Sequence, residues 1–517
     1  MARIIRNREV IGEKNIRIYL GGNLSDLSDP HQMKDMDRLV EILAQKIRKQ
    51  VHIRIIGDYD VDGVTSSHLF LTALRRVGAK VDVVIPHRIQ DGYGLSLHLL
   101  QQAKEDGVDT ILTCDNGIAA IDEIAWAKAQ KMTVLVTDHH AVPFEEHEGR
   151  RTEKKSLADA VVNPHQQDCG YPYKELCGAG VAWNVIRVLY ENYDMDKREA
   201  EDLLDFVAMA TVCDVMSLTG ENRILVKEGL KRIRHTKNIG LQALMQACNV
   251  QPENISAYHF GYVLGPCVNA TGRLDTARHA LRLFETGQET EAEEIARDLV
   301  DLNQERKELT LQGVEMAKKL CEEGGYENDP VLVLFLPDVH ESIAGLIAGR
   351  IREVYNRPVF VLTRGEEGVK GSGRSTENYS MYENMCGCAE LFTKFGGHPM
   401  AAGLSLPEEN VEKFRRKINE NCPLTVEEVC PDIHIDMAMP VGYASTELVH
   451  QFALLEPFGK DNPSPLFADR NLSISRMWLI GKNRNVLRMS VLSEYGQPVP
   501  VTVSYTHLRA HETGAYL

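Results

Sequence analysis

Short apolar runs alternate with helix-like stretches between residues 51 and 140. Compact apolar runs bounded by polar residues are typical of strands buried in a parallel sheet, and the stretches between these runs carry helical periodicity. The predicted strands are Val51–Ile56, Val81–Ile85, Thr110–Thr113 and Thr133–Val136. This rhythm predicts an α/β domain built on a doubly wound parallel sheet.

Helical periodicity replaces this alternation in the middle of the chain. Residues 225–290 have a helical pattern, and Thr290–Glu323 has few helix breakers and apolar residues at recurring positions, such as Ile295, Leu299 and Leu302. We expect a single long helix over Thr290–Glu323 that links two lobes of the protein.

Strand-like segments return in the last third of the chain. A second α/β pattern begins near residue 329, with strands at Val331–Phe335 and Pro358–Leu362 and a helix after His340. From about residue 432 short strands follow one another, which favours a small β-barrel of the OB type. These strands are predicted at Asp432–Ile435, Leu472–Ile474 and Val486–Val491.

The final residues, 504–517, break this alternation where a closing strand is needed. They resemble translated sequencing-adapter read-through, so we expect a tail that is not native and an OB-type domain that is incomplete. The predicted domain order is an N-terminal segment (1–45), an α/β domain (46–225), a helical connector (226–324), a second α/β domain (325–425), the OB-type domain (430–503) and the tail (504–517).

Composition narrows the class of protein. The chain has 517 residues, of which 43% are hydrophobic and 26% are charged, as in a soluble enzyme of several domains. No apolar run approaches the roughly 18 residues of a spanning helix, and the first residues lack the apolar core of a signal peptide, so we expect a cytoplasmic protein without membrane contact. Eleven cysteines without C-x-x-C spacing indicate reduced thiols rather than a zinc site.

Acidic residues outnumber basic ones, with 74 Asp and Glu against 58 Lys and Arg. This balance argues against a chain that coats nucleic acid nonspecifically, because phosphate binding is driven by clustered Lys and Arg. A local basic groove remains compatible with it. We expect part of the acidic excess around a metal site, where carboxylates act as ligands.

Acidic and histidine clusters follow three of the predicted strands. Each of them alone is more simply explained as the N-cap of the next helix. Three in succession at the carboxyl ends of parallel strands instead favour a common site, because open α/β sheets bind ligands at that edge. The clusters are Asp58-Tyr-Asp60-Val-Asp62-Gly63, Asp115-Asn116-Gly117 and Asp138-His139-His140.

Carboxylates gathered with an imidazole in this way indicate a site for two divalent cations. Such a pair of ions activates water and spreads the charge that builds on the oxygens of a phosphate ester under attack. Several carboxylates with one imidazole suit Mn²⁺ or Mg²⁺ better than Zn²⁺ or iron. A helix that begins near Gly63 would present its N-terminus to a phosphate beside the ions.

The order D-Y-D-V-D-G, D-N-G and D-H-H is similar to the first three motifs of the DHH phosphoesterase superfamily, and A-T-V-C-D-V at residues 210–215 resembles the fourth. The resemblance implies a pair of Mn²⁺ or Mg²⁺ ions. It also implies catalytic roles for His140, which would face the scissile phosphate, and for Asp138 and Arg273. The implied metal ligands are Asp60, Asp62, Asp115, His139 and Asp214, with Asp58 close to them.

Residues from about 45 to 500 further resemble the RecJ-type exonucleases of that superfamily, which are specific for single-stranded DNA. The resemblance rests on Arg88 before D-G-Y-G and on the segments N-A-T-G-R (269–273), H-E-S-I-A-G (340–345), G-S-G-R-S (371–375), G-G-H-P-M-A-A-G (396–403) and P-F-G-K-D-N-P (457–463). It implies that the substrate is bound by Arg88, Asn116, Asn269, His340, Ser372, Arg374 and His398.

Two of these substrate contacts have a physical interpretation of their own. The glycines of residues 371–375 predict a turn whose exposed N–H groups form a nest for a phosphate near Ser372 and Arg374. The resemblance implies that Ser372 and Arg374, with Arg88, grip the 5′ end of a strand. For His398, the sequence alone is equally consistent with a loop histidine bonded to the backbone.

The implied function is hydrolysis of single-stranded DNA from its 5′ end to 5′-mononucleotides, in DNA repair and recombination. A single-strand-binding protein and a helicase are the expected partners. Two alternatives stay open: a DHH phosphodiesterase for short RNA or cyclic dinucleotides, and a scaffold that keeps the fold without metals. The β-rich residues 432–503 disfavour the first, and the complete set of acidic and histidine positions disfavours the second.

Overall fold

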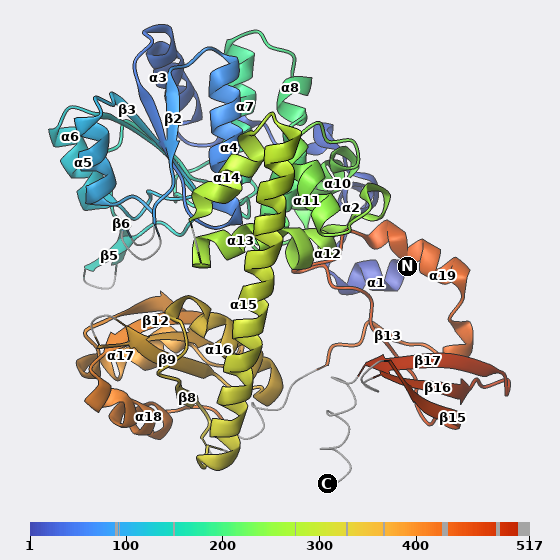
Figure 1. The fold of residues 1–517 in the computed structure, drawn as a ribbon. Coiled ribbons are helices and arrows are strands. Elements are labelled where there is room, and N and C mark those ends of the chain that lie inside the picture. Colours follow the sequence, from blue (N-terminus) through green and yellow to red (C-terminus); the bar gives the residue numbers. More distant parts are fainter. Residues whose placement is uncertain are drawn as a thin grey trace. The chain divides into compact units, whose positions relative to one another are not determined.

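The structure is a computed structural model that describes residues 1–87, 91, 94–147, 150–274, 276–326, 329–365, 368–425, 433–481 and 486–504. The described chain falls into two compact units (Figure 1). The larger holds residues 28–216 and 225–432, and the smaller holds residues 1–27 and 217–224 together with the chain from residue 433 on. Within these described ranges, no helix is both long and apolar enough to cross a membrane.

A five-stranded sheet of order β2-β1-β3-β4-β7 forms the centre of the first α/β domain, and its strands are all parallel. Every residue of β1 and β3 is buried, as expected for strands covered on both faces. The predicted parallel sheet and its four strands are therefore confirmed. The strands are β1 (Ile53–Ile56), β2 (Val81–Val84), β3 (Thr110–Cys114), β4 (Thr133–Thr137) and β7 (Ala160–Val162).

Helices cover both faces of this sheet, so the doubly wound arrangement is also confirmed (Figure 1). On one face, α5 (Leu97–Glu105) and α6 (Ile121–Ala129) share an apolar cluster with the strands. On the other face lie α3 (Met36–Arg48), α4 (Val61–Arg76) and α7 (Gly178–Asn192). A hairpin of β5 (Phe144–His147) and β6 (Arg150–Glu153) follows β4.

The middle of the chain is helical, as predicted. The long helix is α15 (Glu289–Glu323), whose 35 residues span about 52 Å. It packs on α11 and α13, and its later residues join the core of the second α/β domain. The preceding elements are α8 (Arg198–Glu201), α9 (Leu204–Cys213), α10 (Gly220–Ile233), α11 (Ile239–Ala247), α12 (Ala257–His259), the π-helical turn η4 (Phe260–Leu264), α13 (Gly265–Leu274) and α14 (Ala277–Glu285).

The second α/β domain has a five-stranded sheet of order β11-β12-β10-β9-β8. Strands β8 and β9 are parallel, and the other neighbours are antiparallel. The two predicted strands and the helix after His340 are confirmed by β8, β9 and α16. The elements are β8 (Leu332–Phe335), α16 (Glu341–Tyr355), β9 (Val359–Gly365), β10 (Gly368–Arg374), α17 (Met381–Cys386), β11 (Lys394–His398), β12 (Ala401–Leu406) and α18 (Val411–Glu420).

The predicted phosphate-binding turn at residues 371–375 is wrong. Residues 371–374 belong to β10, which pairs with β9 on one side and β12 on the other, so its backbone N–H groups face neighbouring strands and do not form a nest. The glycines have a packing role instead. A Cβ on Gly371 would lie 2.3 Å from a methyl of Leu362, and one on Gly373 would lie 2.6 Å from the sulfur of Met381.

The smaller unit combines the two chain ends. Its helices α1 (Ala2–Asn7), α2 (Glu13–Gly21) and α19 (Thr446–Phe452) lie around a small apolar core. Strands β13 (Met437–Ala438) and β14 (Phe467–Ala468) form one sheet. Strands β15 (Ser473–Ile480), β16 (Val486–Leu492) and β17 (Pro498–Ser504) form an antiparallel one.

The strand predictions for this unit had mixed outcomes. Strands β15 and β16 confirm those near residues 472 and 486. The strand at Asp432–Ile435 is wrong for the described residues 433–435, because Ile433 and Ile435 are 73% and 48% exposed and face no core. Residues 505–517 lie outside the described residues, so the non-native tail and the incomplete barrel stay predictions.

Arg223 joins the two chain ends within the smaller unit. Its side chain is buried and donates to the carbonyl oxygens of Tyr19 (2.7 Å), Leu455 (2.9 Å) and Glu456 (2.7 Å). The guanidinium also lies 4.1 Å from the centre of the Tyr19 ring. Burial lowers the pKa of Arg223 to about 10, so the group is still charged at neutral pH. A rigid planar fork of donors suits several carbonyls at once.

Replacing Arg223 by lysine is expected to lower the free energy of unfolding of the smaller unit by about 2–4 kcal/mol, because one ammonium cannot satisfy all the buried carbonyls. Urea titration followed by hydrogen exchange in α1 and α2 measures this. Arg198→Lys is the control, since Arg198 is 80% exposed and should change stability by less than about 0.5 kcal/mol. Equal losses in the two variants would contradict the role of Arg223.

Candidate metal centre

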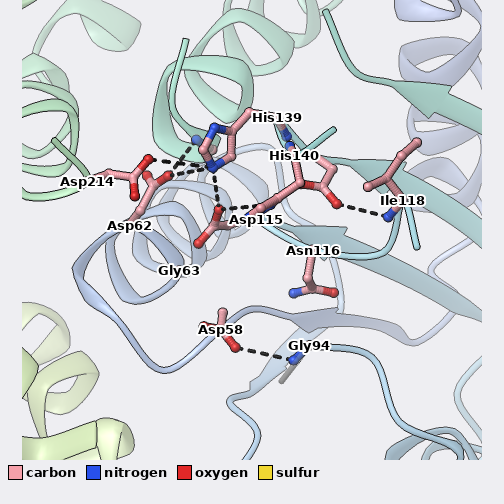
Figure 2. Close-up of polar contacts among 12 residues, drawn as sticks. Asp58, Asp62, Gly63, Gly94, Asp115, Asn116, Ile118, His139, His140 and Asp214 are labelled. Atoms are coloured by element: carbon pink, nitrogen blue, oxygen red, sulfur yellow. Dashed lines mark hydrogen bonds and ion pairs between the residues drawn. The ribbon is translucent and has the colours of Figure 1, made fainter. Parts of the chain in front are cut away.

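The three strand-end clusters meet at one edge of the first sheet (Figure 2). Asp58 and Asp60 lie between β1 and α4, Asp115 follows β3, and the D-H-H segment follows β4. The fourth motif contributes Asp214, the C-cap residue of α9. Parallel strands bring their carboxyl ends to the same edge, which explains why segments so far apart in sequence converge.

His139 lies at the middle of this cluster. Its Nε2 is 3.0 Å from Asp115 Oδ1. The same nitrogen is 3.6 Å from Asp62 Oδ2 and 3.6 Å from Asp214 Oδ2 (Figure 2). The sequence therefore correctly predicted that these side chains come together.

Ligand atoms form three overlapping groups, in each of which they lie within 4.8 Å of one another. Two of the groups share Asp115 and two share His139. Shared ligands are what two neighbouring cations about 3.5–4 Å apart require. The groups are Asp62-His139-Asp214, Asp115-His139-His140 and Asp58-Asp60-Asp115.

The electrostatics of the cluster fit divalent cations. Burial raises the pKa of Asp58 well above its ordinary value, and the charge of Asp60 adds to this. Burial and the charge of Asp62 raise the pKa of both Asp60 and Asp115. Asp58 Oδ2 is also buried and lacks a hydrogen-bond partner among the described residues. Clustered carboxylates that repel one another are stabilised by a hard cation, which favours their charged form.

Asp62 is held by the N-terminus of α7. Its two carboxylate oxygens accept N–H bonds from Gly178 at 2.6 Å and from Ala179 at 2.8 Å. Gly178 also lies against Asp115, because a Cβ there would be 2.6 Å from the Cβ of Asp115. Sequence reasoning missed Gly178 and Ala179. The C-G-A-G segment before an apolar helical run was the only signal for them.

Asp138 orients the two histidines. Its carboxylate accepts N–H bonds from Ile118 (2.9 Å), His139 (2.7 Å) and His140 (3.0 Å), and it bonds His140 Nδ1 at 2.7 Å. Burial opposes its charged form, but these bonds and the nearby histidines lower the pKa of Asp138 below its ordinary value. Asp138 thus serves as a buried acceptor that fixes His140.

His140 is the more exposed of the two histidines, at 39% of its side chain. Burial lowers its pKa, but the hydrogen bond to Asp138 and the charges of Asp138, Asp214 and Asp62 outweigh this and raise the pKa to about 9. His140 is therefore held with its Nδ1 on Asp138, and the surrounding carboxylates favour its protonated form.

Helix α13 braces the first motif from outside. Asn269 Oδ1 accepts the N–H of Val61, the first residue of α4, at 3.1 Å. Gly272 lies against the same loop, since a Cβ there would be 2.5 Å from the carbonyl oxygen of Tyr59. Arg273 Nη1 donates to the carbonyl oxygen of Ser342 at 2.7 Å, which links α13 to α16.

The side-chain amide nitrogen of Asn116 is hydrogen-bonded within the protein. The residue is 2% exposed, and its side-chain amide donates to the carbonyl oxygens of Ile56 (3.1 Å) and Cys114 (3.0 Å). These bonds hold the ends of β1 and β3 together. Its predicted role in substrate binding has no direct support from this arrangement.

The remaining predicted substrate residues lie in the second α/β domain. His340 caps α16, and its Nδ1 lies 2.7 Å from Ser342 Oγ. Ser372 lines a pocket of about 440 Å³ together with Lys370 and Lys394. His398 is exposed at the end of the edge strand β11.

Arg374 lies along α16. Its Nη2 is 2.9 Å from the position that a Cβ of Gly345 would take, so the glycine makes room for the guanidinium. Arg374 Nη1 donates to the carbonyl oxygen of Gly373 at 2.7 Å. Arg88 lies outside the described residues, so its convergence with Ser372 and Arg374 stays a prediction.

Comparison with known proteins follows the same division of the chain. Residues 52–211 match the DHH family N-terminal domain, residues 328–422 match the DHHA1 domain, and residues 435–503 match the RecJ OB domain. These matches coincide with the first α/β domain, the second α/β domain and the strands of the smaller unit.

Curated relatives extend over nearly the whole chain. The single-stranded-DNA-specific exonuclease RecJ of Haemophilus influenzae is 34% identical over 514 residues, which cover 96% of this chain and 87% of that protein. The RecJ of Bacillus subtilis is 32% identical over 501 residues, which cover 96% of this chain and 62% of that protein. The chain thus spans less than two thirds of the second relative.

Solved structures show the same likeness. RecJ from Thermus thermophilus in complex with Mn²⁺ matches with a TM-score of 0.76 and 28% identity, covering 97% of this chain and 74% of that one. An exonuclease RecJ bound to manganese matches with a TM-score of 0.66 and 31% identity, covering 77% of this chain and 96% of that one. On these grounds the chain belongs to the RecJ family of single-stranded-DNA-specific exonucleases, within the DHH phosphoesterases.

Proposed function

We propose that this protein is a metal-dependent exonuclease that hydrolyses single-stranded DNA in the 5′-to-3′ direction and releases 5′-mononucleotides. The observation that carries the proposal is the set of three overlapping ligand groups, in which Asp115 belongs to two groups and His139 to two. The family relatives named as single-stranded-DNA-specific exonucleases support the choice of substrate.

The centre fits two Mn²⁺ or Mg²⁺ ions, because its donors are mainly buried carboxylate oxygens with imidazole nitrogens. Bound there, the ions would activate a water and neutralise the charge that develops on the phosphate oxygens. Asp115, which belongs to two of the ligand groups, would contribute to both ions, and His139 would bind one of them through Nε2. Asp62 and Asp214 would complete one side of the centre, and Asp58 and Asp60 the other.

His140 is placed to act on the phosphate. Asp138 fixes the orientation of the His140 ring through Nδ1, so the ring would be held in place to donate a hydrogen bond when negative charge builds on a phosphate oxygen. We assign Asp138 a positioning role, because its carboxylate is fully used in holding His139, His140 and Ile118. Arg273 would act near the phosphate, held in place by its hydrogen bond to α16.

We assign recognition of the 5′ end of the DNA strand, and with it the direction of hydrolysis, to the second α/β domain. Ser372 and Arg374 lie two residues apart on β10, so their side chains leave the same face of the sheet. Together with Arg88 they would hold a terminal 5′ phosphate by charge-assisted hydrogen bonds. His340, His398, Asn116 and Asn269 are proposed to support the strand or the loops around it.

The RecJ OB domain match at residues 435–503 favours a single strand of DNA over short RNA or cyclic dinucleotides as the substrate. The complete ligand set disfavours a scaffold without metals. A cytoplasmic role in DNA repair and recombination, beside a single-strand-binding protein and a helicase, belongs to the same proposal.

Digestion of end-labelled DNA tests the function directly. With Mn²⁺ or Mg²⁺, the protein should release mononucleotides from 5′-labelled single strands and leave blunt duplexes intact, and a chelator should stop the reaction. Release from the 3′ end, or equal digestion of duplex DNA, would contradict the proposal. Hydrolysis limited to dinucleotides or cyclic dinucleotides would favour the short-substrate alternative.

Asp115→Ala should reduce the rate of hydrolysis by at least about 1,000-fold with saturating Mn²⁺, because it removes a carboxylate shared by two groups of ligands. The variant should stay folded, since it opens no apolar core. The matched control is Asp122→Ala, an exposed acidic residue in the first turn of α6 that should keep full activity. Wild-type rates for Asp115→Ala would show that the ligand assignment is wrong.

Arg374→Ala should weaken binding of 5′-phosphorylated strands by about 1.5–3 kcal/mol, the usual value for a hydrogen bond to a charged group, and spare 5′-hydroxyl strands. Fluorescence anisotropy with both strands measures the difference. Arg364→Ala, which removes an exposed arginine of β9 paired with Glu408, is the control. If both strands lose equal affinity, Arg374 contacts the backbone generally and does not set polarity.

A further inference from the structure

Residues 257–274 form a continuous helical segment that consists of α12, η4 and α13. Its C-terminal end braces the first motif through Asn269 and Gly272, as described above. Its middle is a π-helical turn, a rare feature that is frequent at functional sites. The segment is thus fixed at one end to the centre and carries an irregular turn toward the other.

Phe260 anchors the N-terminal end of this segment. The side chain is fully buried, and its carbonyl oxygen accepts a bond from Cys213 Sγ at 3.3 Å. Cys213 directly precedes Asp214 of the metal centre. Gly265 allows the close contact, since a Cβ there would lie 2.3 Å from Cys213 Sγ. The position of the turn is therefore tied to a ligand-bearing helix end.

Two tyrosines of this segment, one in α12 and one in η4, project into solvent. Tyr258 is 62% exposed and Tyr262 is 70% exposed, although each is a large aromatic side chain. Their rings stack on each other, with centroids 5.1 Å apart and planes inclined by 24°. Each ring covers one face of the other, and their large exposed fractions leave ring surface accessible to a further flat ring.

We propose that Tyr258 and Tyr262 form a base-stacking subsite for the single-stranded DNA substrate. The proposal rests on the proposed function and names a binding surface outside the metal centre and the 5′-end residues. Stacking on an aromatic ring tolerates any sequence, because every base has a π-face. It also discriminates against duplex DNA, whose base faces are already covered by their neighbours.

The position of the two tyrosines suits a DNA strand that leads to the metal centre. Phe260 lies two residues from each tyrosine and is bonded to Cys213, which directly precedes the ligand Asp214. The subsite therefore lies on the part of the segment that contacts the ligand-bearing end of α9. Such a contact adds affinity for the strand and leaves the chemical step unchanged, so it acts on KM and not on kcat.

Leucine and phenylalanine variants test the subsite. Tyr258→Leu and Tyr262→Leu should each raise KM for a single-stranded oligonucleotide by roughly 5- to 100-fold, the range expected for one lost base–aromatic stack, with kcat within about twofold of wild type. Phenylalanine at either position keeps the ring and should restore KM. Circular dichroism and Tm verify that these exposed substitutions leave the fold intact.

Leu157→Ala is the control for loss of exposed apolar surface. Leu157 is 60% exposed and precedes β7, so it lies at the amino-end edge of the sheet, opposite the metal centre. It should have wild-type KM. Wild-type KM for both leucine variants, or an equal rise in the phenylalanine variants, would overturn the subsite.

Abasic oligonucleotides provide the sharper measurement. A single abasic residue is moved along the strand, and binding is followed by fluorescence anisotropy in a chelator, so that the result does not depend on hydrolysis. Wild-type protein should lose affinity at one or two positions, and the leucine variants should lose that dependence. An identical abasic profile in wild type and variants rejects the subsite, whereas wild-type protein that binds but never hydrolyses single strands rejects the proposed function alone.

Discussion

Mutual repulsion among buried carboxylates is the constraint on which the rest of the structure depends. The protein compensates them unequally: backbone N–H groups bond both oxygens of Asp62 and of Asp138, and His140 pairs with Asp138. Asp58 accepts an N–H bond from Gly94 and Asp115 lies 3.0 Å from His139 Nε2, yet burial and neighbouring carboxylates still raise the pKa of both. The fold thus brings together more negative charge than its own hydrogen-bond donors neutralise. Bound divalent cations would neutralise the rest. Ion binding should therefore contribute to stability as well as to chemistry.

Close approach of backbones gives this cluster its shape. Gly63, Gly178 and Gly272 each lie where a Cβ would come within 2.6 Å of the first motif or of Asp115. Three separate helices, α4, α7 and α13, are therefore packed against the ligand loops without intervening side chains. Because each glycine contributes only main chain to these contacts, the positions of the carboxylates do not depend on side-chain rotamers at Gly63, Gly178 and Gly272.

The features of the structure that the sequence predicted correctly are those marked by a pattern within a short stretch of residues. The apolar runs gave the parallel sheet, and acidic residues after β1, β3 and β4 gave the centre. Strand β10 was predicted as a turn because its glycines suggest conformational freedom, whereas their actual role is to make room for Leu362 and Met381. The grouping of residues 1–27 with the C-terminal part was also missed, because it depends on Arg223 contacting carbonyls that are distant in sequence. Contacts between residues far apart in the sequence produce no periodic pattern in it, so the sequence alone does not predict them.

Helix α16 explains how residues of two α/β domains can serve one substrate. Its first turn accepts Arg273 from α13 through the carbonyl of Ser342, and the same turn carries His340. Within the next turn, Gly345 leaves space for Arg374 of β10. A single rigid helix therefore connects a residue that braces the metal centre with residues proposed to hold the 5′ end. The separation between these two groups is then a property of the helix and its caps, which suits an enzyme that would cut at a fixed distance from a strand end whatever the sequence.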